Sequence, residues 1–324
     1  MSLTSARYIG VDVGGTKTLS VLVEVPSNGS PPVVLDRELR PSQAGSDMVL
    51  DTIIESVGAL ISRDATEPAA IGVGLAGFVD RTGIVRSAPN SSGLVGVDVG
   101  AELGRRFDLP TLVDNDANCV AVAAHRGVTG GCDSLVAITL GTGIGGGIVL
   151  GGRLLRGANG FAGEPGHMVV DPDGAPCPCG QRGCWERYAS GSGLARLAAL
   201  AAERGEAASV LDAAGSLDAI RGEHVTDLLA SGDPEAMAIF TRYAGWVALG
   251  VANLILLLDP EVVVIGGGMS VHGALLERLM GEHLSQRFPS ALADRNIRIL
   301  VTPGGPDDGA VGAALLGAYR VAGA

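Results

Sequence analysis

The chain has 324 residues, which is long enough for two lobes that each bury a substantial core. With 23 Lys and Arg against 35 Asp and Glu, its formal net charge of −12 argues against a nucleic-acid or anionic-membrane partner, because phosphate groups are bound by clustered basic side chains. An anionic small molecule is still compatible with this charge if backbone N–H groups bind it.

The start of the chain carries no pattern of a secretory signal. "MSLTSARYIGVDVGG" runs into a strand-like stretch without a basic region followed by an apolar one. The most membrane-like segment, Tyr243–Asp259, is shorter than the ~20 apolar residues that span a bilayer and contains Asn253, so a buried core helix is expected there. We therefore predict a cytoplasmic protein, whose five cysteines are thiols or metal ligands rather than disulfides.

The first half of the chain predicts a glycine-tipped hairpin followed by a helix and further strands. "RYIGVDVGGTKTLSVLVEV" (residues 7–25) indicates a strand, a turn at Gly14 and Gly15, and a second strand. A third strand, an amphipathic helix and two buried parallel strands are then expected, in this order, at residues 33–39, 46–64, 69–77 and 109–116.

The second half repeats this plan. "SLVAITLGTGIGGGIVLGG" (residues 134–152) again indicates a strand, a glycine turn and a strand. A helix ending at Leu258, a strand, a helix, a strand and a last helix from Asp307 should follow, the middle three at residues 261–268, 271–288 and 296–302. The repeated pattern predicts a duplicated α/β fold, although the two halves share little residue identity.

Neither glycine turn fits a conventional nucleotide motif. "GTGIGGG" (residues 141–147) matches G-x-G-x-x-G in spelling, but a strand follows where that motif requires a helix, and "DVGGTKT" lacks Walker A spacing. The backbone N–H groups of the two turns, with the hydroxyls of Thr16, Thr18 and Thr142, could instead hold a triphosphate. Ordinary hairpin turns are the alternative. Asp12, just before the first turn, is placed to position Mg²⁺.

Polar residues gather where the strand at residues 109–116 gives way to a helix. The group comprises Asp114, Asn115, Asp116 and Asn118. One interpretation is that these side chains cap the helix. The other is that an aspartate accepts the proton of a substrate hydroxyl as that hydroxyl attacks the γ-phosphate, while Asn115 bonds a neighbouring hydroxyl.

Five motifs together resemble the ROK family (repressors, open reading frames and sugar kinases). They are "DVGGTKT", "NDAN", "TLGTGIGGG", "EPGH" and "CPCGQRGCWE", in the family's order and across essentially the whole chain. Within the family the chain is most similar to glucose-phosphorylating kinases of the actinobacterial type. The resemblance implies a duplicated actin-like ATPase (ribonuclease H-like) fold of two lobes with a cleft between them. We expect lobes at residues 1–114 with 305–324, and at residues 115–304.

The resemblance also implies roles for individual residues. Asp116 of "NDAN" matches the catalytic base. The residues that match sugar-binding positions are Asn90, Asn115, Asp116, Glu164, His167 and Glu186. Those expected to bind ATP and its phosphates are Asp12, Gly14, Gly15, Thr16, Lys17, Thr142, Gly143, Gly267 and Gly268, the last two from "VIGGGMS", which resembles the segment beside the adenosine.

Three cysteines and a histidine predict a zinc site. Cys177, Cys179 and Cys184 form C-x-C-x₄-C, and His167 precedes them, which supplies four ligands for a closed tetrahedral centre. This spacing is tighter than that of ordinary zinc fingers, and the resemblance strengthens the assignment. Four protein ligands leave no open position for a water, so the zinc should be structural, with the second ring nitrogen of His167 available to a sugar. Cys119 and Cys132 are expected to be buried or incidental thiols.

The implied activity is ATP-dependent phosphorylation of D-glucose at its 6-hydroxyl. N-acetylglucosamine, N-acetylmannosamine or fructose are alternative acceptors, and polyphosphate is an alternative donor that the net acidity disfavours. A sugar-responsive repressor would need a helix-turn-helix domain, for which the few residues before the first predicted strand leave no room. The expected partners are sugar, ATP, Mg²⁺, Zn²⁺ and further copies of the chain, as a homodimer or a dimer of dimers.

Overall fold

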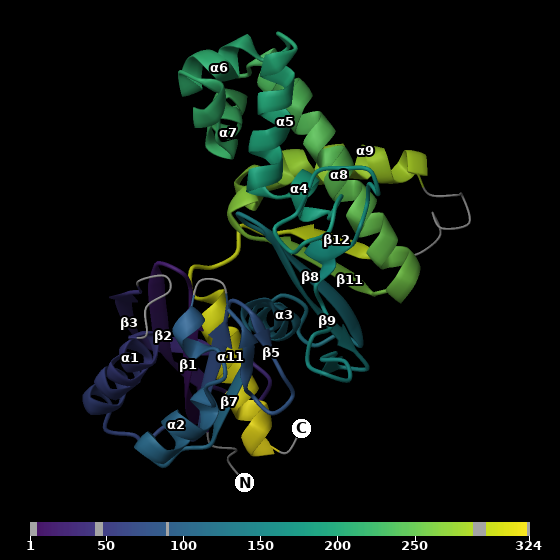
Figure 1. Cartoon of the computed structure of the whole chain (residues 1–324). Coiled ribbons are helices and arrows are strands. Elements are labelled where there is room, and N and C mark those ends of the chain that lie inside the picture. Colours follow the sequence, from purple (N-terminus) through teal and green to yellow (C-terminus); the bar gives the residue numbers. More distant parts are fainter. Residues whose placement is uncertain (1–4, 43–47, 89–90, 288–295, 323–324) are drawn as a thin grey trace. The chain divides into compact units, whose positions relative to one another are not determined.

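The computed structural model describes residues 5–42, 48–88, 91–287 and 296–322 (Figure 1). The chain divides into two compact units: residues 1–137, 147–163 and 305–324 form the first, and residues 138–146 and 164–304 form the second. This division does not coincide with the boundary expected at residue 114. The helix α3 (Asp116–Gly127) belongs to the first unit because it packs against α11 (Asp308–Ala322).

The first unit is built on a five-stranded sheet with the order β3-β2-β1-β4-β7. The first three strands form an antiparallel meander, and β4 and β7 run parallel to β1. The strands are β1 (Ala6–Val13), β2 (Lys17–Val25), β3 (Val33–Pro41), β4 (Ile71–Leu75) and β7 (Thr111–Asn115). A small separate sheet pairs β5 (Phe78–Val79) with β6 (Val85–Ser87). The predicted hairpin and the two predicted parallel strands are confirmed.

Helices cover both faces of this sheet. On one face, α1 (Val49–Arg63) and α2 (Val99–Phe107), with the short η1 (Ser92–Leu94), enclose a core of aliphatic side chains. Of the helix expected at residues 46–64, residues 46 and 47 lie outside the described residues. On the other face α11 lies directly on the strands: a Cβ on Gly10 or Gly72 would meet the backbone oxygen of Ala310 at 1.8 Å or of Ala313 at 1.7 Å. Glycine at these two positions therefore lets helix and sheet backbones touch.

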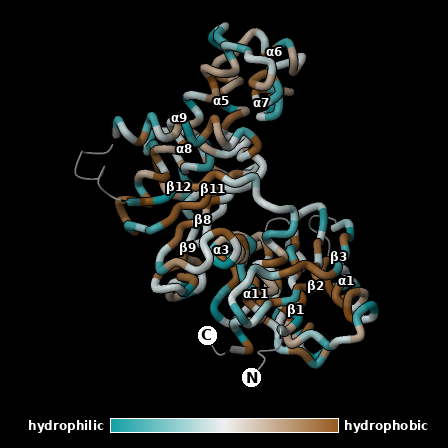
Figure 2. The backbone as a smooth tube through the Cα atoms, turned by 180° about the vertical axis from the view of Figure 1, so that it is seen from behind, coloured by the Kyte–Doolittle hydropathy of each residue, from teal (hydrophilic) through white to brown (hydrophobic). Residues whose placement is uncertain are grey.

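A second five-stranded sheet has the order β10-β9-β8-β11-β12. The glycine turn at Gly141 to Gly143 joins β8 to β9, as predicted, and β11 pairs with β12 in parallel. The strands are β8 (Ser134–Leu140), β9 (Ile144–Leu150), β10 (Arg153–Leu154), β11 (Val262–Gly266) and β12 (Arg298–Val301). Hydrophobic residues follow the central strands of both sheets (Figure 2).

The helices of the second unit surround one long apolar helix, α8 (Pro234–Leu258). The others are α4 (Glu186–Ala189), α5 (Gly191–Glu203), α6 (Ala208–Ala214), α7 (Gly222–Ala230) and α9 (Gly273–Arg287), with short turns η2 (Pro165–His167), η3 (Leu217–Ala219) and η4 (Gly268–His272). Within the described residues, α8 alone has the length and apolarity to cross a membrane, and 50% of its most apolar window is buried. Its fully buried Tyr243 donates a hydrogen bond to the carbonyl of Ala189, so α8 packs as the core helix predicted from sequence.

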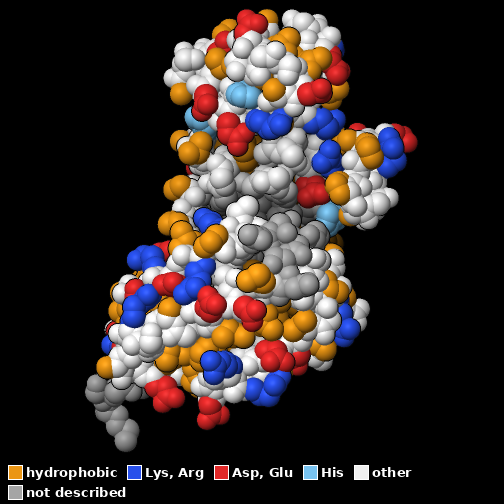
Figure 3. Space-filling view, turned by 60° about the vertical axis from the view of Figure 1, so that its left-hand side comes forward, with side chains coloured by type: hydrophobic (Ala, Val, Ile, Leu, Met, Phe, Trp, Pro, Cys, Tyr) orange, Lys and Arg blue, Asp and Glu red, His pale blue; other side chains and the backbone are white. Residues whose placement is uncertain are grey.

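Charged side chains of both signs are interspersed on the face drawn in Figure 3. On the first unit several of them pair: Arg63 bonds Asp36 and Glu38 of β3, and Arg37 bonds Asp307. These pairs are exposed, and such pairs each contribute little to stability, about 0–1 kcal/mol.

Candidate active site

In the first unit, Asp12 and Asn115 lie near the carboxyl ends of β1 and β7, the two strands on either side of β4. β1, β4 and β7 are parallel, and Asp12, Gly74 and Asp114 stand side by side across them. Asp12 is partly buried: a Cβ on Gly309, in the first turn of α11, would lie 2.9 Å from its Oδ2. Burial raises the pKa of the Asp12 carboxyl above its ordinary value of 3.8, and the charge of Lys17 acts in the opposite direction. A carboxylate at this edge is suited to meeting a cation.

At the junction of β7 and α3, the structure distinguishes the residue that caps the helix from the residue that could act as a base. Asn115 is the N-cap of α3, since its Oδ1 accepts from the N–H groups of Ala117 at 2.9 Å and Asn118 at 3.1 Å. Its Nδ2 donates to the carbonyl of Gly77 at 3.0 Å. Asp116 is the first helical residue, and its Oδ1 accepts from the N–H of Ala117 at 2.8 Å. The capping interpretation therefore holds for Asn115, and α3 does not depend on Asp116 for its cap.

Asp114 forms part of a buried hydrogen-bond network. Its Oδ1 accepts from Nδ2 of Asn118 at 2.8 Å, and its Oδ2 accepts from Nε of Arg156 at 2.7 Å. The Asp114 side chain is only 6% exposed. A buried charge held by several donors is a structural group, because removing it leaves those donors without partners.

We expect Asp114→Asn to destabilise the first unit by about 2 kcal/mol or more, because the half-buried guanidinium of Arg156 loses its charged partner. Urea unfolding of the variant and the wild type measures this difference. A variant as stable as the wild type would contradict the structural role assigned to Asp114.

The first glycine turn leaves most of its predicted donors accessible. The N–H of Gly14 bonds the carbonyl of Lys17 at 2.9 Å and closes the hairpin, while the Thr16 and Lys17 side chains are exposed. Thr18, expected to add a hydroxyl donor, is instead fully buried, with Oγ1 2.6 Å from Oγ of Ser42. That expectation was wrong, because Thr18 lies within β2, whose side chains are buried on both faces of the sheet from Thr18 to Val23.

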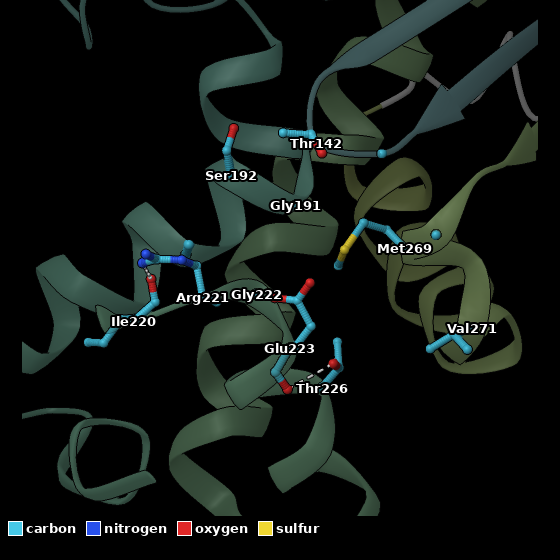
Figure 4. Close-up of a pocket in the computed structure, with 13 residues that line it drawn as sticks. Thr142, Gly191, Ser192, Ile220, Arg221, Gly222, Glu223, Thr226, Met269 and Val271 are labelled. Atoms are coloured by element: carbon cyan, nitrogen blue, oxygen red, sulfur yellow. Dashed lines mark hydrogen bonds between the residues drawn. The ribbon is translucent and has the colours of Figure 1, made fainter. Parts of the chain in front are cut away.

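The second glycine turn borders a cavity of about 640 Å³ within the second unit (Figure 4). Thr142 and Gly268, two of the residues expected to bind ATP, line it together with Gly141 and Gly191, whose N–H bonds the carbonyl of Gly141 at 2.8 Å. The other lining residues are Ser192, Ala195, Ile220, Arg221, Gly222, Glu223, Thr226, Met269 and Val271. None of these was expected to bind a ligand, because no motif marks the segments around α5 and α7.

Two other predicted glycines do not line this cavity. Gly267 has a φ of 93°, and a Cβ there would lie 2.6 Å from the carbonyl oxygen of Leu140, so glycine is required by the turn itself. A Cβ on Gly143 would lie 2.9 Å from Oε2 of Glu186. The carboxylate of Glu186, the first residue of α4, therefore lies close to the second hairpin.

The predicted metal ligands come together in the second unit. The ligand atoms of His167, Cys177, Cys179 and Cys184 all lie within 4.8 Å of one another. Backbone hydrogen bonds shape the loop, with the N–H of Cys177 on the carbonyl of Gln181 at 2.8 Å and a bridge pairing Val169 with Cys184. Three thiols and an imidazole in one small cluster are the donor set of a structural zinc centre.

Two acids, Glu164 and Glu186, lie beside this cluster, of which His167 is a member. The Nδ1 of His167 faces Cys177, 4.0 Å from its Sγ, and Oε1 of Glu186 lies 3.1 Å from the same sulfur. Burial raises the pKa of the Glu164 carboxyl, the charge of His167 lowers it, and that of Glu186 raises it. The predicted sugar-binding residues of this unit are therefore neighbours. Asn90, the other predicted sugar ligand, lies outside the described residues.

Two sheets of duplicated design, each opened by a glycine-tipped hairpin, together with an aspartate near the end of the first strand, define the actin-like ATPase fold. A family model described as "ROK family" matches residues 8–319. The chain belongs to the ROK family.

Relatives of known name extend over most of the chain. It is 38% identical over 278 residues to a glucokinase of Streptomyces coelicolor, covering 83% of this chain and 84% of that protein. It is 35% identical over 321 residues to a glucokinase of Thermotoga maritima, covering 98% and 99%. The crystal structure of a ROK family glucokinase from Streptomyces griseus in complex with glucose and AMPPNP is 35% identical, with a TM-score of 0.80, covering 97% and 100%.

Proposed function

We propose that this chain transfers the γ-phosphate of MgATP to the 6-hydroxyl of D-glucose. It is 35% identical, over nearly the whole of both chains, to a glucokinase whose crystal structure contains glucose and the ATP analogue AMPPNP. It is also 35–38% identical to two other glucokinases. Membership of the ROK family supports an ATP-dependent hexose kinase.

The mechanism is supported by the first residues of α3, where Asn115 and Asp116 have different roles. Because Asn115 caps the helix through two backbone N–H groups, Asp116 is not needed as the cap. We assign Asp116 as the base that accepts the proton of the 6-hydroxyl as its oxygen attacks the γ-phosphorus. Asn90, Asn115, Glu164, His167 and Glu186 are assigned to the other sugar hydroxyls, since neutral amides and carboxylates suit an uncharged polar ligand.

The donor and the metals are assigned to the remaining groups. The exposed Thr16 and Lys17 beside the first turn, with Thr142 and Gly268 at the cavity, are assigned to the phosphates. Asp12 would hold Mg²⁺, which neutralises charge on the phosphates when bound. His167, Cys177, Cys179 and Cys184 would hold a structural zinc that fixes the loop around His167.

A panel of sugars tests this function. With MgATP, the enzyme should phosphorylate D-glucose with a higher kcat/KM than N-acetylglucosamine, N-acetylmannosamine or fructose, measured as ADP release. Oxidation of the product by glucose-6-phosphate dehydrogenase identifies the position of the phosphate. A higher kcat/KM for another hexose would replace glucose in the proposal, and the absence of any ATP-dependent transfer would refute it.

We also propose that the chain acts in the cytoplasm as a homodimer or a dimer of dimers. The end of α8 supports self-association, since Leu256 and Leu257 are 56% and 78% exposed. Light scattering coupled to size exclusion measures the oligomeric state, and a monomer at micromolar concentration would contradict it.

The phosphate assignment can be tested with a substitution that leaves the fold intact. A Cβ on Gly268 would meet no atom within 4 Å, so alanine fits the unliganded protein. We expect Gly268→Ala to raise the KM for ATP by about 10-fold or more, because the methyl group would occupy space through which phosphate reaches backbone N–H groups. The KM for glucose should stay unchanged in steady-state assays.

Gly281→Ala is the matched control, since its Cβ also meets nothing within 4 Å and Gly281 does not line the cavity. Gly143 is a less suitable probe, because a side chain there would displace Glu186 as well. Equal KM values for ATP in Gly268→Ala and Gly281→Ala would remove Gly268 from the phosphate site.

A further inference from the structure

The cavity of the second unit is lined by an acid, Glu223, as well as by Thr142 and Gly268, which are assigned to phosphate binding. Phosphate binding gives no reason for an acid at this place. Glu223 lies in the first turn of α7, and Figure 4 shows its side chain projecting into the space between Arg221 and Met269. The glycine end of the same cavity is suited to phosphates. A carboxylate facing a bound polyanion would repel it, so this acid indicates a different kind of ligand group nearby.

No cation in the described residues neutralises this carboxylate. It takes part in no hydrogen bond or ion pair within that part of the chain. The guanidinium of the adjacent Arg221 is directed elsewhere, with Nη1 donating to the carbonyls of Asp218 and Ile220 at 2.9 Å each. The acceptor oxygens of Glu223 are therefore available to a neutral donor such as a hydroxyl group.

Apolar side chains line the cavity around Glu223. Ile220 is 4% exposed, Met269 is 9% exposed, and Val271 is 71% exposed. An exposed valine at the mouth of a cavity offers apolar surface to a ligand. The combination of one unneutralised acid and an apolar wall fits a nucleoside, which carries hydroxyl donors and a flat ring.

The backbone places Glu223 close to the phosphate end. A Cβ on its neighbour Gly222 would lie 3.0 Å from the carbonyl oxygen of Gly191, and the N–H of Gly191 bonds Gly141 of the glycine turn. In a nucleoside triphosphate the ribose is the part next to the phosphates, and the base is farther away. Glu223 is therefore positioned for the ribose.

We propose that Glu223 accepts hydrogen bonds from the ribose hydroxyls of the donor and thereby selects a nucleoside triphosphate over polyphosphate. The inference rests on the proposed function in that it takes ATP as the phosphate donor. A ribose with two adjacent hydroxyls can donate to both carboxylate oxygens. Polyphosphate has no such donors and would bring further negative charge to the same carboxylate.

The test compares Glu223→Ala with wild type using ATP and 2′,3′-dideoxy-ATP. Losing a hydrogen bond to a charged group corresponds to roughly a 10- to 100-fold rise in the KM for ATP, with kcat little changed. With 2′,3′-dideoxy-ATP the two proteins should differ by less than about 3-fold, because the hydroxyls are already absent. Asp227→Asn, an exposed acid on the same helix outside the cavity, is the matched control.

Glu223→Gln tests the selection, because it removes the charge and keeps the shape. Its kcat/KM for polyphosphate relative to ATP should rise above that of the wild type. Three results would overturn the proposal: an unchanged KM for ATP in Glu223→Ala, a penalty that persists with 2′,3′-dideoxy-ATP, or a lower melting temperature as the sole effect, which is what a helix-terminal acid alone predicts.

Calorimetric binding of ADP separates this inference from the proposed function. If the wild type binds ADP but phosphorylates no sugar, the function fails, and the affinity of Glu223→Ala for ADP and for 2′,3′-dideoxy-ADP still decides the role of Glu223. If the wild type phosphorylates glucose and both variants bind these nucleotides as it does, the function stands and the ribose assignment is wrong.

Discussion

Asp116→Asn should keep its fold and its sugar affinity while kcat falls by at least ~100-fold. Positioned proton transfer contributes about 10²–10⁴ in rate, and asparagine keeps the shape of the side chain while removing the base. A loss confined to kcat would mark an interaction needed mainly in the transition state. Steady-state kinetics with glucose, together with a direct measurement of glucose binding, give the two quantities separately.

Asp114→Asn is the informative companion, because the two carboxylates are adjacent in sequence and differ in their surroundings. Asp114 is bound by Asn118 and Arg156, so its substitution should lower the free energy of unfolding. Asn115 is the N-cap of α3, and asparagine at position 116 keeps an oxygen that can accept from the N–H of Ala117, so this substitution should leave the melting temperature near that of the wild type. A well-folded Asp116→Asn enzyme with normal turnover would refute the assignment of the base.

Loss of the cysteine cluster should have the other large effect. We expect Cys184→Ser to lose zinc, to lower the melting temperature, and to raise the KM for glucose by about 10-fold or more, since metal binding contributes directly to the folding of such loops. Elemental analysis, thermal unfolding and sugar kinetics on one preparation measure all three. Glucose binding should weaken because His167 and Glu186 lie at the cluster.

Cys132→Ser provides the control, since Cys132 is a partly buried thiol outside the cluster whose Sγ contacts only the carbonyl of Ser134 in the described hydrogen bonds. Wild-type protein purified without chelators that contains no zinc would contradict the metal assignment. If Cys184→Ser retains zinc and a normal KM for glucose, Cys184 is not a zinc ligand.

Much of the fold could be predicted from the sequence because it depends on local patterns. Continuous apolar runs indicated β4 and β7, and glycines between β-branched residues indicated both hairpins. The clustering of His167 with the three cysteines could be predicted because the cysteines lie within eight residues and share one loop. In each case, neighbours in the sequence determine the geometry.

The remaining candidate site residues depend on contacts that sequence neighbours do not determine. Glu223 resembles any exposed acid at a helix start, and only the packing of α7 beside Gly191 brings it to the cavity. Asn115 and Asp116 are equally good capping residues by type, so the hydrogen bonds of the folded chain were needed to tell them apart. Thr18 follows the glycine turn directly in the sequence, and only the folded chain shows that its hydroxyl is buried against that of Ser42.

The packing of α11 directly against Gly10 and Gly72 has a consequence for folding during synthesis. β4 ends at Leu75 and α11 begins at Asp308, so at about 5–20 residues per second a ribosome needs on the order of 10 to 50 seconds to supply the helix that covers this face. During that time the first sheet has strands but lacks one of its layers, while the second unit is being synthesised. In nascent chains arrested before residue 305, the first unit should therefore be sensitive to protease. In chains whose α11 has emerged from the ribosome, the first unit should be protected.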